Sequence, residues 1–242
     1  MKLFGRESEL AKLAGWMRAD RSFILYGPAG VGKTRLLDEL APEFPSMLRV
    51  SSCATPRAFF GAVTLALWKR EHPALCKRLR SRDDLSELSI GDLKALCLSA
   101  LKDFKLILIL EDVHFSSRPL TAALKDARNQ CGFPLVFVAR SCHMEDVGYL
   151  VRVYADRSER FHLANFEPAT AKQFAGLVAS EFHIEAENRP DFLTQVVSLS
   201  EGNPGAILSM IRMASTPKYR SGDFIKSTLL YVDFRLTRKV RA

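Results

Sequence analysis

Eight consecutive residues have the types and spacing of a phosphate-binding loop. The segment Gly27-Pro28-Ala29-Gly30-Val31-Gly32-Lys33-Thr34 meets the pattern G-x-x-x-x-G-K-[ST] at every fixed position. Its glycines allow successive backbone N–H groups to point at phosphate oxygens, because they accept backbone angles that side chains forbid. Lys33 supplies a positive charge to the β- and γ-phosphates, and Thr34 offers a hydroxyl to Mg²⁺. This phosphate loop predicts a site for a nucleoside triphosphate with Mg²⁺.

A second pair of residues suited to this chemistry follows an apolar run further along the chain. Residues 106–110 are all aliphatic, and Glu111 and Asp112 come directly after them. In enzymes with a phosphate loop, one acid at such a strand end holds Mg²⁺ while its neighbour orients the attacking water. We expect Glu111 to lie nearer the metal and Asp112 to help position the water.

The elements around these motifs have the order that the chemistry needs. The apolar run 22–26 predicts a buried strand before the phosphate loop, and 34–40 has the apolar spacing of a helix after it. Further short apolar runs alternate with helical segments and predict four more strands, at 47–50, 106–110, 135–139 and 161–163. This pattern is typical of a five-stranded parallel sheet with helices on both faces. The phosphate loop would then lie at the carboxyl end of the first strand.

The character of the chain changes after Phe166, where strand-like runs stop. Segments 169–182 and 191–200 have helical spacing, and a third helix opens near Pro204. Proline is tolerated there because the first turn of a helix has no internal acceptor for its N–H group. We therefore predict an all-helical region after the sheet.

The last residues form a basic tail with a different pattern. Leu230, Val232, Phe234 and Leu236 alternate with polar neighbours, which predicts a strand. The predicted organisation is thus a nucleotide-binding α/β domain over 1–165, a helical lid subdomain over 166–216 and a basic tail over 217–242.

The composition is that of an ordinary globular protein with an excess of positive charge. The chain has 242 residues, of which 48% are hydrophobic, and a formal net charge of +8. Because it shows neither a long apolar run nor a secretion signal, we expect no membrane span and a cytoplasmic location. Its five cysteines include no C-x-x-C pair, which argues against a disulfide framework or a zinc site. Basic residues gather at 69–82 and 218–242, as in a solvated basic face or a surface for an anionic partner.

Five short motifs together resemble the AAA+ ATPases, in particular the STAND and origin-recognition-like branch. They are the segment 4–10 with its Gly-Arg-Glu, the phosphate loop, Leu110-Glu111-Asp112-Val113-His114, Val138-Ala139-Arg140 and Gly202-Asn203-Pro204. The resemblance implies an α/β P-loop NTPase fold, with a parallel five-stranded sheet and a C-terminal helical lid subdomain. It also implies ATP or ADP with Mg²⁺ as ligands, and slow hydrolysis of ATP to ADP and phosphate.

The same resemblance assigns roles to individual residues. Gly5 and Arg6 would lie near the adenine, Arg140 would sense the γ-phosphate and Pro204 would touch the base. Arg35, which follows the phosphate loop, joins the nucleotide-binding set, and the metal ligands would come from Thr34, Glu111 and Asp112. The Glu-Asp order departs from the usual Asp-Glu of the family, which leaves open which carboxylate holds the metal. A neighbouring subunit would supply an arginine, for which Arg152, Arg157 and Arg160 are in the right neighbourhood and Arg157 is the candidate.

These inferences favour an ATP-dependent switch that changes the angle between its core and its lid and associates with copies of itself when ATP binds. Its partner would be a protein. The leading alternative is a DNA-associated ATPase of the transposition-helper or replication-initiator type, acting on duplex DNA; the stretch 55–60 also resembles that branch. Two other classes stay open: a small-molecule phosphotransferase, and a regulatory ATP-binding protein without turnover.

Overall fold

The computed structural model describes residues 3–51, 53–103, 105–154 and 159–240. The chain divides into two compact units. The sheet unit consists of residues 8–27 and 33–163, and the helical unit of residues 1–7, 28–32 and 164–242. Five residues of the phosphate loop, Pro28–Gly32, thus belong to the helical unit.

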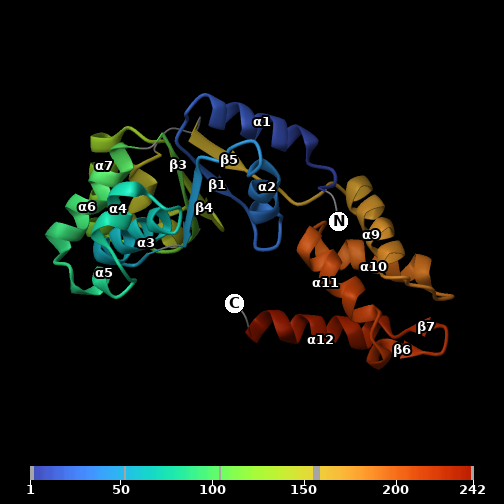
Figure 1. Ribbon diagram of the computed structural model, residues 1–242. Helices are drawn as coiled ribbons and strands as arrows, with labels where there is room; N and C mark the ends of the chain where they lie inside the picture. Colours follow the sequence, from blue (N-terminus) through green and yellow to red (C-terminus); the bar gives the residue numbers. More distant parts are fainter. Residues whose placement is uncertain (1–2, 52, 104, 155–158, 241–242) are drawn as a thin grey trace. The chain divides into compact units, whose positions relative to one another are not determined.

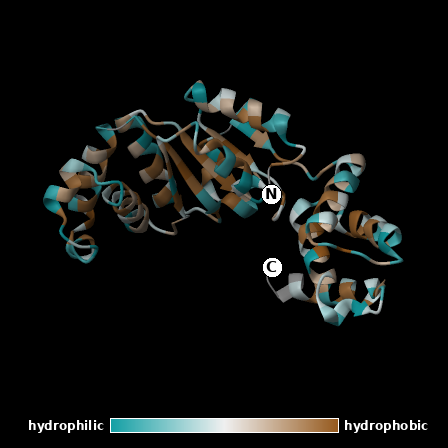
Figure 2. Cartoon of the chain, turned by 45° about the vertical axis from the view of Figure 1, so that its right-hand side comes forward, coloured by the Kyte–Doolittle hydropathy of each residue, from teal (hydrophilic) through white to brown (hydrophobic). Residues whose placement is uncertain are grey.

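The sheet unit is built on five parallel strands in the order β2-β3-β4-β1-β5 (Figure 1). They are β1 (Phe23–Tyr26), β2 (Met47–Ser51), β3 (Ile107–Val113), β4 (Leu135–Ala139) and β5 (Arg160–His162). The strands are predominantly hydrophobic (Figure 2), and every residue of β4 is buried. Runs that are apolar at nearly every position suit strands covered on both faces. The predicted five-stranded parallel sheet is confirmed.

Helices join these strands in the alternating order expected of an α/β fold. They are α1 (Glu7–Arg18), α2 (Lys33–Leu40), α3 (Pro56–Trp68), α4 (Pro73–Arg78), α5 (Asp84–Glu87), α6 (Ile90–Lys102), α7 (Arg118–Cys131), α8 (Met144–Val147) and the 3₁₀ helix η1 (Tyr149–Arg152). Three of them begin at a hydroxyl residue whose side chain accepts a hydrogen bond from a first-turn N–H: Thr55 for α3, Ser89 for α6 and Ser117 for α7. Such caps satisfy one of the N–H groups that a helix start leaves without an internal partner.

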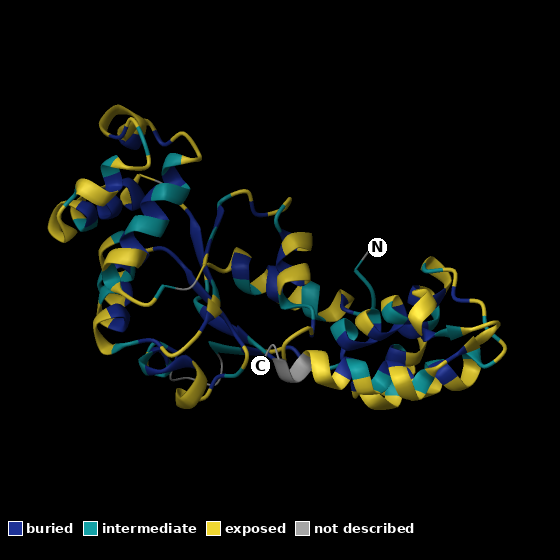
Figure 3. Ribbon diagram, turned by 90° about the horizontal axis from the view of Figure 1, so that it is seen from below, coloured by how far each residue is buried: buried dark blue, intermediate teal, exposed yellow. Residues whose placement is uncertain are grey.

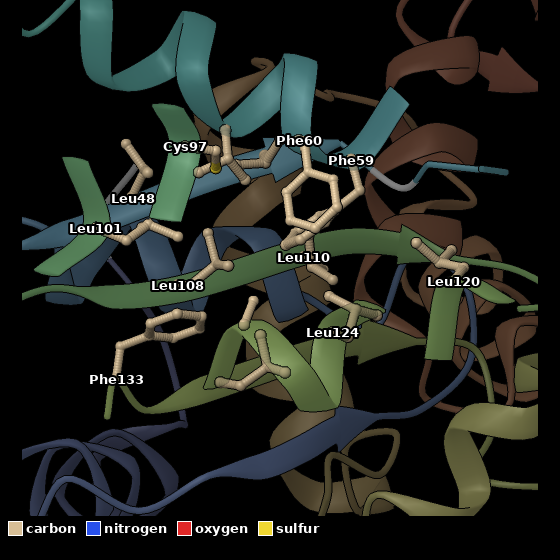
Figure 4. Close-up of a cluster of buried hydrophobic side chains, with 14 of the residues drawn as sticks. Leu48, Phe59, Phe60, Cys97, Leu101, Leu108, Leu110, Leu120, Leu124 and Phe133 are labelled. Atoms are coloured by element: carbon tan, nitrogen blue, oxygen red, sulfur yellow. The ribbon is translucent and has the colours of Figure 1, made fainter. Parts of the chain in front are cut away.

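The core of the sheet unit lies where β3 meets α3, α6 and α7 (Figure 4). Leu108 and Leu110 of β3 belong to one buried cluster with Phe59 and Phe60 of α3, and all four residues are at most 4% exposed. Cys97 and Leu101 of α6 and Leu120 and Leu124 of α7 complete the cluster. Truncating a residue of this kind to alanine typically costs about 2–5 kcal/mol of stability. The strand that ends in the two carboxylates is therefore firmly anchored.

The helical unit contains α9 (Pro168–Glu181), α10 (Arg189–Ser200), α11 (Pro204–Ala214) and α12 (Ser227–Val240). Between α11 and α12 lie the 3₁₀ helix η3 (Pro217–Tyr219) and a hairpin of β6 (Arg220–Ser221) and β7 (Phe224–Ile225). The three helices predicted after Phe166 are confirmed as α9, α10 and α11. The division of the chain at 165 and 216 stays a prediction.

The prediction of a strand over 230–237 is wrong, because these residues lie in α12. Leu230 and Phe234, four residues apart, are buried at 1% and 5% exposure, whereas Val232 and Leu236 are 48% and 58% exposed. Exposed residues accordingly recur along this helix (Figure 3). Alternating apolar positions also contain an i, i+4 pair, so the same residues can serve a helix that buries only one of its faces.

Across the described ranges, none of the helices combines the length and the apolar character that crossing a bilayer requires.

Candidate functional site

The phosphate loop connects β1 to α2, and Lys33 is the first residue of that helix. Gly30 and Gly32 have φ angles of +80° and +104°, in the region where a Cβ causes strain. The loop also contains a hydrogen bond from the Val31 N–H to the Pro28 carbonyl, at 3.3 Å. The glycines predicted from the sequence pattern thus occupy positions that require glycine.

The amine of Lys33, in the sheet unit, interacts with both polar and charged groups. Its Nζ donates a hydrogen bond to the Gly27 carbonyl at 2.6 Å. Burial lowers the pKa of Lys33, the negative charge of Asp112 raises it, and the positive charge of Arg140 lowers it further. The net pKa lies below its ordinary value. An additional anion at this position, such as a phosphate, would favour the charged amine.

The charges of Asp112 and Arg140 therefore both influence the pKa of the Lys33 amine, although the two residues are far apart in the sequence. Asp112 belongs to β3 and Arg140 directly follows β4, and both residues are exposed. Parallel strands end at one edge of a sheet, which explains why these two side chains act on Lys33. Of the predicted site residues, the structure brings Lys33, Asp112 and Arg140 into one electrostatic group.

Glu111 has a different environment from Asp112. Its Oε1 accepts hydrogen bonds from Arg49 of β2, at 2.5 Å from Nη2 and 3.1 Å from Nε. Arg49 also forms an ion pair with Asp38 of α2. Glu111 is thus paired with an arginine, while Asp112 is the carboxylate that acts on Lys33. The expectation that Glu111 lies nearer the metal stays a prediction.

A β-bulge interrupts β3 at the two acids. In the pairing of β3 with β4, Leu110 is opposite Phe137 and Val113 is opposite Ala139, so β3 contains one extra residue between these pairs. Asp112 lies in this interval and has a φ of +49°, which is unusual for a residue with a side chain. Bulges re-aim side chains and are common beside active sites. Sequence reasoning did not find this bulge, because an apolar run that ends in acids has no local signal for it.

Thr34 and Arg35 lie on the exposed side of the first turn of α2. The Arg35 guanidinium forms an ion pair with Glu39 on the same helix at 3.4 Å. Thr34 and Asp112 both provide oxygen atoms, the donors that Mg²⁺ prefers. These residues fit the chemistry of a Mg²⁺ site, and their assignment as ligands stays a prediction.

In the helical unit, Arg6 is almost completely buried, at 6% exposure. Its Nη2 donates to the Ala164 carbonyl at 2.6 Å and to the Val31 carbonyl at 3.4 Å, and its guanidinium lies 4.4 Å from the centre of the Phe166 ring. Gly5, at φ +61°, leaves no room for a side chain, because a Cβ would come within 2.8 Å of Thr170 Cγ2. Both residues hold the start of the chain beside the loop and the 164–166 segment. Their predicted proximity to an adenine base stays a prediction.

Asn203, which precedes Pro204 at the start of α11, contacts the phosphate loop but was not among the predicted site residues. It is 4% exposed, and its Nδ2 donates to the Ala29 carbonyl of the phosphate loop at 3.0 Å. The neighbouring Gly205 N–H donates to the Gly30 carbonyl at 2.9 Å. The sequence marks Asn203 as a helix cap, but its contact with a loop 174 residues earlier has no local signal. Arg49, a cation within an apolar strand, was also missed.

Of the three candidates for the arginine that a neighbouring subunit would supply, the structure describes two, Arg152 and Arg160. Arg157 lies outside the described residues. The Arg152 guanidinium lies 5.4 Å from the centre of the Tyr149 ring, and Arg160 is the first residue of β5. The role of Arg157 therefore stays a prediction.

Comparison with known proteins identifies the family. The protein-family model described as "AAA ATPase domain" matches residues 2–138, which is more than half of the chain. A search of curated proteins finds no match.

Solved structures with the same fold include an ORC1 protein, a signal transduction ATPase and a DnaA protein. The ORC1 protein of Aeropyrum pernix, solved in complex with DNA, is 17% identical at a TM-score of 0.65, with 98% of this chain and 66% of that chain covered. A STAND protein with a tetratricopeptide repeat sensor from Pyrococcus horikoshii is 16% identical at a TM-score of 0.56, covering 97% of this chain and 32% of that one. AMPPCP-bound DnaA of Aquifex aeolicus is 15% identical at a TM-score of 0.56, covering 99% and 68%.

The chain spans about two thirds of the ORC1 structure and about a third of the STAND protein. At these identities the likeness concerns the fold. Together with the family match and the geometry of the phosphate loop, it shows that this chain belongs to the AAA ATPase domain family of AAA+ P-loop ATPases.

Proposed function

We propose that this chain binds ATP with Mg²⁺, hydrolyses it slowly and uses the nucleotide state to switch its conformation or its assembly. The observation that carries the proposal is the geometry of the phosphate loop, in which Gly30 and Gly32 have positive φ angles and the Lys33 Nζ donates to the Gly27 carbonyl at 2.6 Å. The charges of Asp112 and Arg140 act on the same amine. A cation from the loop, a carboxylate and a planar guanidinium are the groups that phosphoryl transfer to water requires.

Each residue has a distinct part in this mechanism. Lys33 neutralises charge on the β- and γ-phosphates, and Arg140 contacts the γ-phosphate as charge develops on its oxygens. Thr34 and Asp112 would hold Mg²⁺, which would stabilise the charge on the phosphate oxygens. Asp112 also orients the attacking water. Glu111 acts indirectly, because its carboxylate is engaged by Arg49.

The helical unit is the proposed output of the switch. Its stretch Pro28–Gly32 is part of the phosphate loop, so we propose that nucleotide binding alters this unit. We propose that the switch acts in the cytoplasm, that ATP promotes self-association and that the recipient of the signal is a protein.

A second candidate function is ATP-controlled association with duplex DNA. Six basic residues between α3 and α5 are exposed: Lys69, Arg70, Lys77, Arg78, Arg80 and Arg82. Clustered exposed cations provide the sequence-independent part of DNA binding. The fold neighbour ORC1 was solved with DNA, which supports this candidate at the level of fold.

The test is a nucleotide titration with the whole chain and its Lys33→Ala variant. We expect ATP binding by the parent chain and a loss of at least about tenfold in affinity in the variant, because backbone dipoles alone leave phosphate charge unbalanced. Lys94→Ala is the matched control, since it removes one lysine of α6 that is paired with Asp126 of α7. Equal affinity of the Lys33 variant and the parent would refute the proposal. Sizing the parent with and without ATP and duplex DNA then separates self-association from DNA binding.

A further inference from the structure

The start of α11 and the phosphate loop share a single hydrogen-bond system within the helical unit. Pro204, the first residue of the helix, has no N–H group to satisfy. The Ala206 N–H donates to Asn203 Oδ1 at 3.0 Å, and the Ile207 N–H donates to the Asn203 carbonyl at 3.0 Å. The remaining donor of the first turn, the Gly205 N–H, is satisfied by the loop carbonyl of Gly30 at 2.9 Å. The loop therefore completes the cap of α11.

Asn203 adds a second link between the same two segments. While its Oδ1 caps the helix, its Nδ2 donates to the Ala29 carbonyl at 3.0 Å and to Asn165 Oδ1 at 3.1 Å. The side chain is 4% exposed, so water competes little for these bonds. Two successive loop carbonyls, of Ala29 and Gly30, are thus held by the start of α11.

The start of α11 and the phosphate loop approach each other so closely that positions 30 and 205 require glycine. A Cβ on Gly205 would lie 2.9 Å from both the Cα and the carbonyl oxygen of Gly30. A Cβ on Gly30 would lie 2.8 Å from Asn203 Oδ1. Since both distances are shorter than side chains tolerate, the helix and the loop can approach this closely only with glycine at 30 and 205.

Holding a carbonyl determines where the next N–H group points. The C=O and N–H groups of a trans peptide point in opposite directions, and the described chain contains no cis peptide bonds. Because the Ala29 carbonyl faces Asn203, the Gly30 N–H faces away from Asn203. A loop of this kind binds phosphates through such N–H groups, so their direction decides its affinity.

We propose that Asn203 is a positioning residue for nucleotide binding, which acts by fixing the orientation of the 29–30 peptide unit. Gly205 holds the next peptide unit, whose Val31 N–H closes the turn of the loop on the Pro28 carbonyl. The proposal rests on the proposed ATP-binding function. It gives the Gly-Asn-Pro turn a second task besides starting a helix, because the turn pre-orders the loop before a triphosphate arrives. Pre-ordering raises affinity by removing part of the ordering cost of binding.

The decisive variant is Asn203→Ser, studied in the whole chain. Serine retains an oxygen that caps the helix but is too short and lacks the amide donor to reach the Ala29 carbonyl. We expect the dissociation constants of ATP and ADP to rise roughly fivefold, the worth of one net hydrogen bond, and the thermal midpoint of the nucleotide-free protein to fall, because two partly buried hydrogen bonds lose their donor. Asn203→Ala, which loses the cap as well, should show the same rise together with a still lower midpoint.

Asn188→Ser is the matched control in the same unit. The Asn188 side chain also bonds to backbone on both sides, donating to the Ile225 carbonyl and accepting from the Ile225 N–H, each at 2.9 Å. This variant should lower the thermal midpoint without changing the affinity for nucleotide. If Asn188→Ser and Asn203→Ser weaken nucleotide binding equally, Asn203 has a merely structural role and the proposal is wrong.

Gly205→Ala tests the same link without altering Asn203. Alanine is the better helix former, so any loss of affinity would come from the steric push on Gly30 rather than from a weaker helix. We expect a rise in both dissociation constants of at least the size seen for Asn203→Ser. If the parent binds ATP and the Gly205→Ala and Asn203→Ser variants bind it with the same affinity, the positioning role of Asn203 is wrong but the proposed function stands. If the parent chain binds no ATP, the proposed function itself is wrong.

Discussion

Arg49 of β2 and Glu111 of β3 form a charged hydrogen bond in which Nη2 lies 2.5 Å from Oε1. Both side chains are about one quarter exposed, at 26% and 25%. Burial alone lowers the pKa of Arg49, but its hydrogen bonds with Glu111 and Asp38 outweigh that effect and raise the pKa above its ordinary value. Arg49 thereby connects the helix of the phosphate loop, through Asp38, to the strand that carries the acid pair.

Replacing Arg49 with Met should destabilise the protein by about 1–3 kcal/mol, because the Glu111 carboxylate would keep its partly buried position without a partner. Adding Glu111→Gln should recover part of that loss. Urea unfolding of the two single variants and the double variant gives the coupling energy. A coupling of zero would mean that the pair contributes nothing to stability.

Asp112→Asn should reduce ATP turnover by about 10²–10³-fold while ATP binding is retained, since orienting the water and the metal matters in the transition state rather than for affinity. Glu111→Gln serves as the comparison and should reduce turnover much less. Phosphate release at saturating ATP measures both. A larger loss for Glu111→Gln would restore the order of roles that the sequence suggested.

Gly202→Ala should be among the most destabilising single substitutions in the helical unit. The φ angle is +73°, and a Cβ would lie 2.2 Å from the Phe166 carbonyl oxygen. Gly222→Ala is the matched control, because its φ of +56° is similar and a Cβ there meets nothing within 4 Å. The control should cost about 1–2 kcal/mol for backbone strain, and Gly202→Ala should exceed it by at least about 1 kcal/mol in urea unfolding. Equal losses would contradict the steric account.

Because residues 227–240 form a helix, truncating Phe234 and truncating Val232 should affect stability very differently. Phe234→Ala should destabilise the protein by about 3–5 kcal/mol, because the ring is 5% exposed in the helical unit's core. Val232→Ala, at 48% exposure, should change stability by less than about 0.5 kcal/mol. In a strand with alternating faces the two side chains would be equivalent, so similar losses in thermal unfolding would argue for the strand.

Features encoded by neighbouring residues were predictable from the sequence, and those made by distant residues were not. Most of the strands were evident from short apolar runs, and the phosphate loop because its glycines and lysine lie within eight consecutive residues. The α12 residues were misassigned because four alternating apolar positions fit a strand as well as a helix. The pairing of Arg49 with Glu111, the bulge at Asp112 and the hold of Asn203 on Ala29 depend on which elements become neighbours. Periodicity within one element contains no such information.

The position of Arg6 has a consequence for the order of events during synthesis. Its backbone acceptor, Ala164, is 158 residues further along the chain. At a translation rate of about 5–20 residues per second, roughly 8–30 seconds pass between the appearance of the guanidinium and that of its partner. The Phe4 ring is likewise synthesised long before Phe174, on which it stacks with 5.8 Å between the ring centres. The opening segment of the chain can therefore reach its native place only after every strand of the sheet has been made, so the helical unit completes its folding last.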